Sequence, residues 1–513
     1  MTSFGLSRRA ALQAVGAVSL LPLLRVPARA AVGSTATVAY NVDLPSFDPT
    51  VGASAVNPTI QSLYQAVFDP YIAQAPDLSF KPGLLTKWGW NVDRSKLALE
   101  VRGNAVWHNG DPLTAEDVAW SLRRAADPKS GNPIGFVWSS LGNVKASGNI
   151  VTADVLHYDP TIFKWMAFLT GYVLPRKYYE QVGADGFEKA PVGSGPYQVD
   201  AFERGSFLRL KANPAYWGGA PAYRTVVFKF VTDASARVAE IESGSADVTL
   251  EVPYEEFTRL RDAPGLAGIT TPISDIAMIF ITDGGVMLDR NVRLAANHAI
   301  NKQAIVDRLL HGYGVPIATL DAPGYAAYDP SITVAYDPAL AKKLLADSGY
   351  SREKPVRFNI QTTRGYKPKD YEMIQAVVGM WRAVGIEATI QVYEIAQHYE
   401  LRARHALQPA AFYDWGNAIG DPTTSTGFAM EMHSPHSAWH QKALSDQMGP
   451  LWGEKDEVRR IAGWKAVDRT IADEGYVIPL LQYVQPILHR REMAVVPQQN
   501  GMVLPQNFRP AST

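Results

Sequence analysis

The sequence predicts an α/β fold in which parallel strands are joined by crossover helices. A β-rich run at 226–231 (VVFKFV) is followed by a helical stretch and by a second strand at 248–250. The same order returns later, where 356–360 alternates apolar and polar residues, 369–384 has helical spacing, and 386–392 alternates again. Two strand–helix–strand units of this kind favour layered α/β architecture.

The helix of the first unit is recognisable from its ends. Either Asp233 or Ser235 is suited to the N-cap, because both side chains accept hydrogen bonds from N–H groups of a first turn. Val238 and Ile241 are three positions apart and therefore share one helical face. Ser243-Gly244 ends the helix, since glycine readily adopts the left-handed conformation found there.

The helix of the second unit is apolar along one side and ends at Gly385. Its apolar residues recur at helical spacing: Ile374, Val377, Val378 and Trp381. The strand over 386–392 follows directly, with apolar residues at every second position. One face of that strand is therefore expected to be buried.

Three further helices are predicted from their terminal residues. The run TAED at 114–117 resembles a capping box. Asp337, followed by proline, is an N-cap, and the helix that it begins is expected to end at Gly349. A third helix is expected to begin at Asp289 and to continue without a break to Gly312.

Length and composition indicate a globular protein of several packing units. The chain has 513 residues, of which 47% are hydrophobic and 19% are charged. Domains commonly span on the order of 100–200 residues, so two to four units are expected. A net charge of −1 gives no reason to expect a nucleic acid partner. The absence of cysteine excludes disulfides, cysteine-ligated metals, thiol catalysis and a lipid-anchored cysteine.

The first thirty residues have the layout of a secretory signal peptide. Arg8-Arg9 precedes an uncharged run over 10–24, and Ala-Arg-Ala at 28–30 is a cleavage site of the A-x-A type. The apolar run is shorter than the ~20 residues of a membrane span. A buried N-terminal helix is the alternative, and the paired arginines at its start argue against it.

The paired arginines, with Leu12 three positions on, resemble a twin-arginine signal. Ala11 and Gln13 replace the usual phenylalanine and lysine. Cleavage before Ala31 would leave 483 of the 513 residues, with 45 basic and 50 acidic side chains and a net charge of −5. We therefore expect a soluble exported protein, free in a periplasm because no cysteine is available for a lipid anchor.

The sequence lacks the common motifs of catalysis and phosphate binding. The patterns G-x-x-x-x-G-K-[ST], H-E-x-x-H and G-x-S-x-G are all absent. Gly312 and Gly314 are close in sequence, but the third glycine of a dinucleotide-binding fingerprint is missing. We therefore expect a protein that is not an enzyme and that carries no cofactor.

One cluster of histidines could bind a metal ion if the chain turned suitably. His433, His436 and His440 are close in sequence, and Glu431 precedes them. Pro435 interrupts a regular helix there, so a shared helical face cannot be assumed. We expect ordinary loop histidines and keep the three as weak metal-ligand candidates.

Four segments in chain order carry further motifs. They are LEVRGNAVWHNGDPLTAEDVAWSLRR at 99–124, PVGSGPYQVDAFERGSFLRLKANPAYWGGAP at 191–221, VRLAANHAINKQAIVDRLLHGYG at 292–314 and YDPALAKKLLADSGY at 336–350. In these segments the chain resembles the periplasmic solute-binding proteins of ABC importers. The class is the peptide/nickel-binding one (family 5, like dipeptide- and oligopeptide-binding proteins).

The resemblance implies a clamshell of two lobes, of the type II, cluster C-like kind, with an extra domain in the first lobe. Domain I would comprise 31–71, 190–283 and 480–513. The extra domain II would span 72–189, and domain III, the second lobe, would span 284–479.

The resemblance places ligand contacts in the segment FYDWGNAIGDP at 412–422. In peptide-binding relatives this loop reads roughly W-x-x-D-x-x-[DE]-P. Trp415 matches the tryptophan that lies against the ligand, and Asp421 matches the acidic residue before proline. The backbone that follows the tryptophan, at Gly416 and Asn417, would pair with the ligand main chain.

Ala418 stands where those relatives have the aspartate that binds the ligand's α-ammonium. A buried ammonium without a counter-ion is strongly disfavoured. Either Asp414 or another acid takes over this role, or the ligand has no free amino terminus of that geometry.

The remaining ligand contacts implied by the resemblance lie in two other segments. Thr-Arg-Gly-Tyr at 363–366 resembles the place where dipeptide-binding relatives hold the ligand carboxylate, so Arg364 and Tyr366 are candidates. A surface salt bridge is the alternative for Arg364. Asn41 and Asp43 lie where relatives make further contacts, and a plain first strand is the alternative there.

The expected function is that of an uptake receptor whose ligand stabilises closure of the two lobes. The expected partners are a peptide or small-molecule ligand and the membrane subunits of an ABC permease, and the receptor is expected to be a monomer. A peptide-like or anionic ligand is favoured by Ala418 with Arg364. An opine, a sugar-phosphate conjugate, a nickel chelate or haem is the alternative, as are a sensory receptor and, more remotely, a secreted hydrolase.

Overall fold

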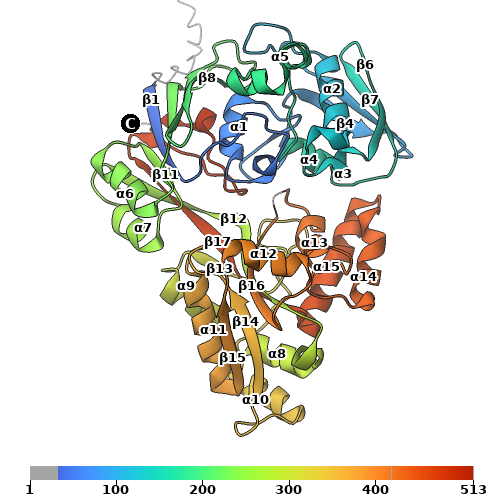
Figure 1. Cartoon of the computed structure of the whole chain (residues 1–513), viewed down its shortest axis with the longest axis vertical. Coiled ribbons are helices and arrows are strands. Elements are labelled where there is room, and N and C mark those ends of the chain that lie inside the picture. Colours follow the sequence, from blue (N-terminus) through green and yellow to red (C-terminus); the bar gives the residue numbers. More distant parts are fainter. Residues whose placement is uncertain (1–32, 418, 512–513) are drawn as a thin grey trace, which may run out of the picture.

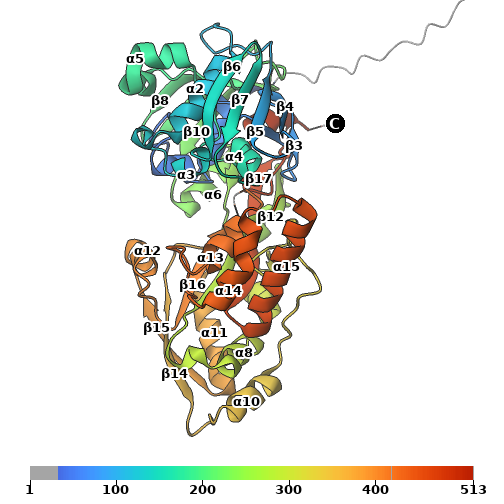
Figure 2. The ribbon, with the colours of Figure 1, turned by 90° about the vertical axis from the view of Figure 1, so that its right-hand side faces the viewer.

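The computed structural model describes residues 33–417 and 419–511 and shows two lobes, drawn one above the other in Figure 1. The expected signal peptide at 1–30, its cleavage site and Ala418 lie outside the described residues. The upper lobe holds about the first half of the chain and its C-terminal end, and the lower lobe holds most of the second half (Figures 1 and 2).

A large mixed sheet runs through both lobes. In the upper lobe its order is β11-β1-β10-β9-β8, and in the lower lobe it is β15-β14-β16-β12-β17, with β13 on β17. The upper strands are β1 (Gly33–Tyr40), β8 (Tyr197–Glu203), β9 (Phe207–Ala212), β10 (Tyr223–Phe230) and β11 (Val248–Leu250). The lower strands are β13 (Gly314–Pro316), β14 (Val356–Thr362), β15 (Ile386–Val392) and β16 (Ala410–Gly416).

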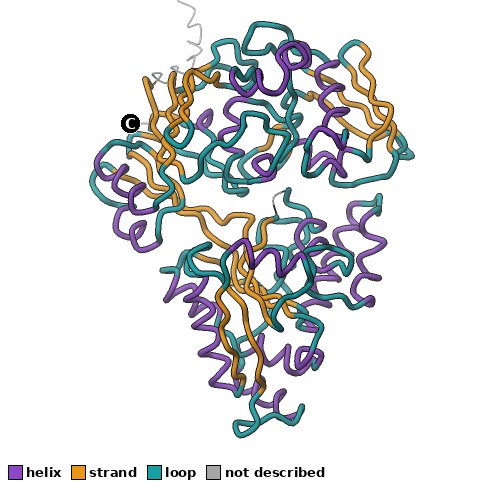
Figure 3. The backbone as a smooth tube through the Cα atoms, viewed as in Figure 1, coloured by secondary structure: helices purple, strands orange, loops and turns teal. Residues whose placement is uncertain are grey.

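Two long strands, β12 (Leu266–Ile281) and β17 (Val477–Arg490), connect the lobes. Their antiparallel pairing is irregular between Pro272 and Ile276, where the chain passes from one lobe to the other. Figure 3 shows these strands continuing from the upper lobe into the lower one. The lobes are thus joined through backbone that a small change in twist can bend.

Both predicted strand–helix–strand units are present. The strands β10 and β11 flank β1 and are parallel to it, and α6 (Ala234–Ser243) joins them. Asp233 is the N-cap of α6, with its side chain accepting a hydrogen bond from the Ala236 N–H, and Gly244 ends the helix at φ 82°. The strands β14 and β15 are parallel neighbours joined by α11 (Asp370–Val384). β14 is also parallel to β16, and the other pairs in this sheet are antiparallel, so the sheet is mixed.

The predicted single helix from Asp289 to Gly312 is wrong. The structure has two helices there, α8 (Arg290–His298) and α9 (Lys302–Leu309). The break has a local cause, because the Asn301 side chain accepts a hydrogen bond from the Ala304 N–H at 2.9 Å and so caps a new helix. The other two predicted helices are α2 (Ala115–Ala126), which begins with a capping box, and α10 (Pro338–Asp347).

A second unit of the upper lobe has its own antiparallel sheet and its own core. Its strands, in the order β4-β5-β7-β6, are β4 (Leu85–Trp90), β5 (Lys96–Val101), β7 (Ile150–Val155) and β6 (Leu141–Ser147). The helices α2, α3 (Gly135–Trp138) and α4 (Ile162–Ala167) pack with this sheet into one apolar cluster. We call this part the four-stranded unit.

The remaining helices complete the lobes. In the upper lobe they are α1 (Gln61–Val67), α5 (Arg176–Lys189) and, next to the connecting strands, α7 (Tyr254–Leu260). In the lower lobe they are α12 (Ile395–Ala403), α13 (Phe428–Met430), α14 (Lys442–Met448) and α15 (Glu457–Glu474). The short strand pairs are β2 (Ala73–Gln74) with β3 (Phe80–Lys81), and β18 (Met493–Ala494) with β19 (Arg509–Pro510). No helix in the described part of the chain is long and apolar enough to span a membrane.

Candidate functional site

A cavity of about 260 Å³ lies between the two lobes and is lined from both sides. Asp77, Leu78, Ser79, Phe80 and Lys164 line it from the upper lobe, together with Gln499 from the C-terminal segment. Gly324, Tyr325, Ala326, Ile419 and Gly420 line it from the lower lobe. Concave sites at domain interfaces are the common location of ligand pockets, so this region is the candidate binding site.

The loop after β16 reaches from the lower lobe into the upper one. Ile419 is 2% exposed and belongs to the apolar cluster of the four-stranded unit. In the opposite direction, Leu78 packs against the apolar cluster of the lower lobe. This exchange of apolar side chains holds the loop at the margin of the cavity.

Asp421 anchors the same loop through charge. Its carboxylate is fully buried, 2.6 Å from the Lys164 ammonium of α4 and 2.7 Å from the Arg460 guanidinium of α15. Burial alone disfavours the charged carboxylate, but these two cations outweigh it and hold the pKa of Asp421 well below its usual range. Asp421 therefore connects elements of both lobes rather than pointing freely into the cavity.

Asn417 also supports the loop from within. Its amide oxygen accepts hydrogen bonds from the Asp421 N–H at 2.9 Å and from the Thr424 hydroxyl at 2.8 Å. Its own N–H donates to the Ser274 carbonyl at 2.7 Å. The Asn417 backbone, which the resemblance assigned to ligand pairing, is thus occupied by contacts within the chain, since its carbonyl also accepts a hydrogen bond from the Gly420 N–H at 3.1 Å.

Trp415 lies at the end of β16 and is 9% exposed. Its ring meets Phe280 edge to face, and its indole N–H donates to the Thr424 carbonyl at 2.8 Å. The next residue, Gly416, is exposed and pairs with Asp275 across the ladder between β12 and β16. The tryptophan therefore forms a fixed wall beside open backbone.

Asp414, also from β16, takes part in a charged group that the sequence did not reveal. Lys367 lies 3.0 Å from Asp414 and 2.5 Å from Asp275. Burial raises the pKa of Asp275 to about 6. The positive charge of Lys367 opposes this increase, whereas the negative charge of Asp414 adds to it. Burial lowers the pKa of Lys367, but the two carboxylates outweigh it and the value lies well above the usual range. The polar Ser-Asp pair at 274–275, directly before the apolar run 276–281 of β12, was a sequence signal of this group.

Two tyrosines extend this charged group toward the surface. The Tyr399 hydroxyl donates to Asp414 at 3.2 Å, and the Tyr366 hydroxyl lies 3.2 Å from that of Tyr399. Tyr366 is 44% exposed. It therefore offers an accessible aromatic surface next to a site whose charges are internally paired.

Arg364 does not join this group. It is exposed, and its guanidinium lies 3.8 Å from the centre of the Tyr371 ring. No ion pair joins it to any residue of 33–417 or 419–511, so the alternative of a surface salt bridge is not seen there. A second arginine that the sequence did not single out, Arg402 of α12, is 8% exposed and lies beside Trp415.

Asn41 and Asp43 follow β1 in the upper lobe. The Asn41 side-chain amide donates to Glu251 at 2.6 Å, while its own oxygen is buried without a hydrogen-bond partner among the described residues. Asp43 accepts hydrogen bonds from the Leu44 and Gly205 backbone and so holds a turn. Asn41 retains an unused acceptor, and Asp43 is engaged in local structure.

The three candidate histidines do not converge on one point. His433 is exposed, and His436 meets the Trp415 ring edge to face. His440 lies 3.0 Å from His405 and 3.3 Å from the Asp283 carboxylate. Within 33–417 and 419–511, no three histidine or acidic side chains are placed to hold a metal ion.

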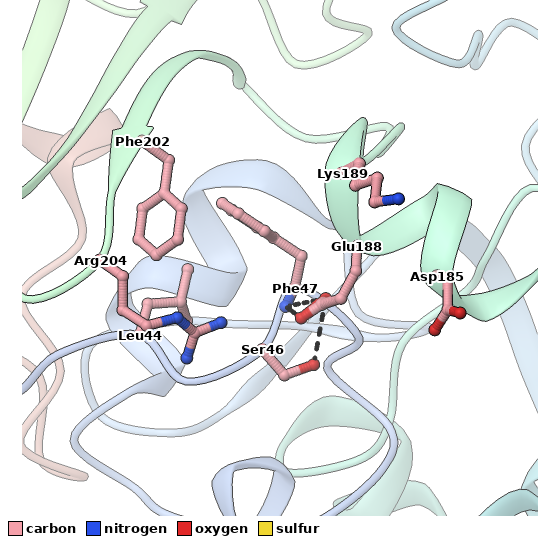
Figure 4. Close-up of a pocket in the computed structure, with 8 residues that line it drawn as sticks. All are labelled: Leu44, Ser46, Phe47, Asp185, Glu188, Lys189, Phe202 and Arg204. Carbon is pink, nitrogen blue, oxygen red and sulfur yellow. Dashed lines mark hydrogen bonds between the residues drawn. The ribbon is translucent and has the colours of Figure 1, made fainter.

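A second cavity, of about 320 Å³, lies within the upper lobe (Figure 4). The Glu188 carboxylate there accepts hydrogen bonds from the Phe47 N–H at 2.7 Å and the Ser46 hydroxyl at 3.3 Å. Arg204 donates to the Pro45 carbonyl at 2.9 Å. Although this cavity is larger, its polar groups serve to hold the segment after β1, and it has no wall from the lower lobe. The cavity between the lobes is therefore the better candidate.

Comparisons with known proteins agree with the fold. The family described as "Bacterial extracellular solute-binding proteins, family 5 Middle" matches residues 79–430. The chain is 24% identical to the dipeptide-binding protein of Escherichia coli K12, over 77% of this chain and 79% of that protein. It is 23% identical to the nickel-binding periplasmic protein of the same organism, over 91% and 93%. Among solved structures, HbpA2 from Haemophilus parasuis superposes with a TM-score of 0.83 at 20% identity, over 93% of this chain and 100% of that one.

Proposed function

Since the chain belongs to the bacterial extracellular solute-binding proteins of family 5, we propose that it is the substrate-binding receptor of an ABC importer. The observation that carries the proposal is the cavity between two lobes that two long strands of a continuous sheet, β12 and β17, connect. A ligand that contacts both lobes favours the closed arrangement by its difference in affinity for the two states. The closed form would then deliver the ligand to the permease.

The proposed ligand is a peptide, a peptide-like solute or another small anionic solute. The similarity to a dipeptide-binding protein and to a nickel-binding periplasmic protein supports this range. Asp414, the acid that could take over the role of the aspartate missing at 418, lies with Asp275 on Lys367, which already neutralises much of their charge. A free α-ammonium would therefore compete with Lys367, and a solute with a blocked amino end is favoured. A nickel chelate, haem, an opine or a sugar-phosphate conjugate is the alternative.

The proposal also covers the cellular location of the protein and the boundaries of its domains. The receptor acts in the periplasm as a monomer, after removal of 1–30, without a lipid anchor and without enzymatic activity. Domain I comprises 31–71, 190–283 and 480–513, domain II is 72–189, and domain III is 284–479. The presence of separate apolar clusters in domains II and III supports the distinction between these two domains, with Ile419 and Leu78 each packing against the other domain's cluster.

The proposed ligand contacts are on both sides of the hinge. Trp415 and Tyr366 supply aromatic surface, and Gly416 supplies open backbone. Asn41 supplies an unpaired acceptor from the upper lobe. Asp414 acts within its group with Lys367, whereas Asn417, Asp421 and Asp43 act by holding the loops that shape the site. Arg364 would have to swing from Tyr371 to reach a ligand.

The test combines a thermal-shift screen with small-angle X-ray scattering on the processed protein. The screen contains free and N-acetylated dipeptides, an opine, a sugar phosphate, a nickel chelate and haem. A true ligand at about 100 times its Kd adds roughly 2.7 kcal/mol of stability and also lowers the radius of gyration, because the lobes close. Conversion of the ligand on incubation, seen by mass spectrometry, would instead favour a hydrolase. Absence of any compaction with every stabilising compound would contradict the receptor mechanism.

A further inference from the structure

Arg402 carries a buried charge that no acidic side chain of residues 33–417 and 419–511 neutralises by contact. The residue lies near the end of α12 and is 8% exposed. Its Nε is buried without a hydrogen-bond acceptor, and no hydrogen bond or ion pair joins its guanidinium to another side chain among residues 33–417 and 419–511. Burying an unpaired charge costs several kcal/mol, so a missing partner is expected.

Aromatic rings surround this guanidinium. Its central carbon lies 4.8 Å from the ring centres of both Tyr399 and Tyr413, and 5.4 Å from that of Trp415. Stacking on rings engages the faces of a guanidinium, but its five N–H donors point outward in its plane. The in-plane donors are the ones that lack acceptors. A planar acceptor with two oxygens, such as a carboxylate, fits a fork of that kind.

The acidic group nearest to Arg402 is already engaged elsewhere. The negative charge of Asp414 acts through space to raise the pKa of Arg402. The direct contacts of Asp414 are nevertheless to Lys367 at 3.0 Å and to the Tyr399 hydroxyl. Burial lowers the pKa of Arg402, and the Arg402 charge also contributes to lowering the pKa of His436 on the other side of Trp415. The surroundings of Arg402 therefore leave room for one negative charge from outside the chain.

The position of Arg402 in the fold is suited to a ligand. The helix α12 lies at the end of the lower lobe that faces the upper lobe (Figures 1 and 2). Trp415, which stacks near Arg402, directly precedes the loop that carries Ile419 and Asp421 into the upper lobe. A group bound to Arg402 would thus lie beside Trp415, at the start of the loop whose Ile419 and Gly420 line the cavity.

We propose that Arg402 is the residue that binds a carboxylate of the transported solute, held in a ring of Tyr399, Tyr413 and Trp415. The inference rests on the proposed receptor function and narrows it to solutes that bear a carboxylate. It also replaces Arg364, which the sequence suggested, as the principal anion-binding arginine.

The test uses pairs of probes that differ only in charge. N-acetyl-dialanine and N-acetyl-diphenylalanine are each compared with their C-terminal amides by calorimetry and thermal shift, and inorganic phosphate is a separate arm. The expected result is that at least one acid binds at least tenfold more tightly than its amide. Arg402→Gln should abolish this preference, and the matched control Arg364→Gln should preserve it.

Several outcomes would overturn the assignment. Equal binding of acids and amides, or retained preference in Arg402→Gln, would remove Arg402 from ligand binding while leaving the receptor function intact. Stabilisation by phosphate but by no carboxylate would assign Arg402 to phosphorylated solutes instead and contradict the carboxylate. If no probe, charged or neutral, shifts the Tm, and no compound of the broader screen does so either, the result contradicts the proposed receptor function and with it the role of Arg402.

Arg402→Lys keeps the experiment informative if the glutamine variant folds poorly. Lysine retains the positive charge and part of the stacking but lacks the planar fork, so the acid-over-amide preference should weaken without vanishing. The ligand-free variants are also compared for Tm. A large drop in Tm for Arg402→Lys, together with unchanged acid binding, would show that Arg402 has only a structural role.

Discussion

Lys164 and Asp421 are 257 positions apart in the chain, yet the Lys164 ammonium lies 2.6 Å from the Asp421 carboxylate. One residue belongs to the four-stranded unit and the other to the loop of the lower lobe. The Arg460 guanidinium lies 2.7 Å from the same carboxylate, and both side chains are 0% exposed. This ion pair is the direct charged link between the lobes at the margin of the cavity, and its strength affects how readily they separate.

Replacing Lys164 with methionine is expected to destabilise the protein by about 1–3 kcal/mol, because Asp421 stays buried with one cation fewer. The measurement is urea unfolding, with scattering to detect lobe opening. The matched control is Lys96→Met, whose pair with Asp154 also spans 2.6 Å but is 64% exposed at the lysine. Exposed pairs contribute at most about 1 kcal/mol, so equal losses in the two variants would show that the link has no special role.

The pKa of Asp275 predicts a distinct pH dependence. Because burial raises it to about 6 in the folded state, protonation of Asp275 favours folding. Its contribution is fully present below its unfolded value of about 4 and is lost as the pH rises through 6. The difference in unfolding free energy between wild type and Asp275→Asn should therefore decrease from pH 4 to pH 7. A flat difference would mean that Asp275 titrates normally.

The contribution of Asp421 to stability has the opposite pH dependence, since the pKa of Asp421 lies below the usual range. Its contribution is present at neutral pH and is lost as the pH falls below about 4. Asp421→Asn should therefore cost most at neutral pH and least in acid, measured by unfolding at both conditions. Because Lys164 and Arg460 remain in this variant, a loss independent of pH would point to packing and not to charge.

Asn301 is expected to contribute about 1 kcal/mol as the N-cap of α9. Asn301→Ala removes the acceptor for the Ala304 N–H, whereas Asn301→Asp retains one and serves as the control. Unfolding in urea should show the loss only in the alanine variant. Equal loss in both would mean that Asn301 acts through other contacts.

Helix ends that depend on neighbouring residues were predictable. The Asp233 cap, the Thr114 and Asp117 capping box and the end of α11 at Gly385 were all predicted correctly, because a cap is a contact within a few positions. The prediction of an unbroken helix from Asp289 was wrong for a related reason. Apolar periodicity continues through 299–301, and only the competition from the Asn301 side chain ends one helix and starts another.

The site was predictable in part. Trp415, Gly416 and Asp414 were identified through a family resemblance carried by a contiguous motif. Lys367, Asp275 and Arg402 were missed, since each acquires its meaning from a partner on another element. Asp275 in β12 meets Asp414 in β16 through Lys367, which lies in the loop before α11.

By itself, the sequence determined the α/β class, the family and the local caps, because periodicity, turn chemistry and contiguous motifs are properties of neighbouring residues. Only the tertiary structure decided which charges are paired. It places Lys164 on Asp421, keeps Arg364 on the surface beside Tyr371, and buries Arg402 among three rings with no acidic contact from the described part of the chain. The reason is physical: the free energy of a charge depends on its burial and on its partners in space, and both are set by how distant segments pack.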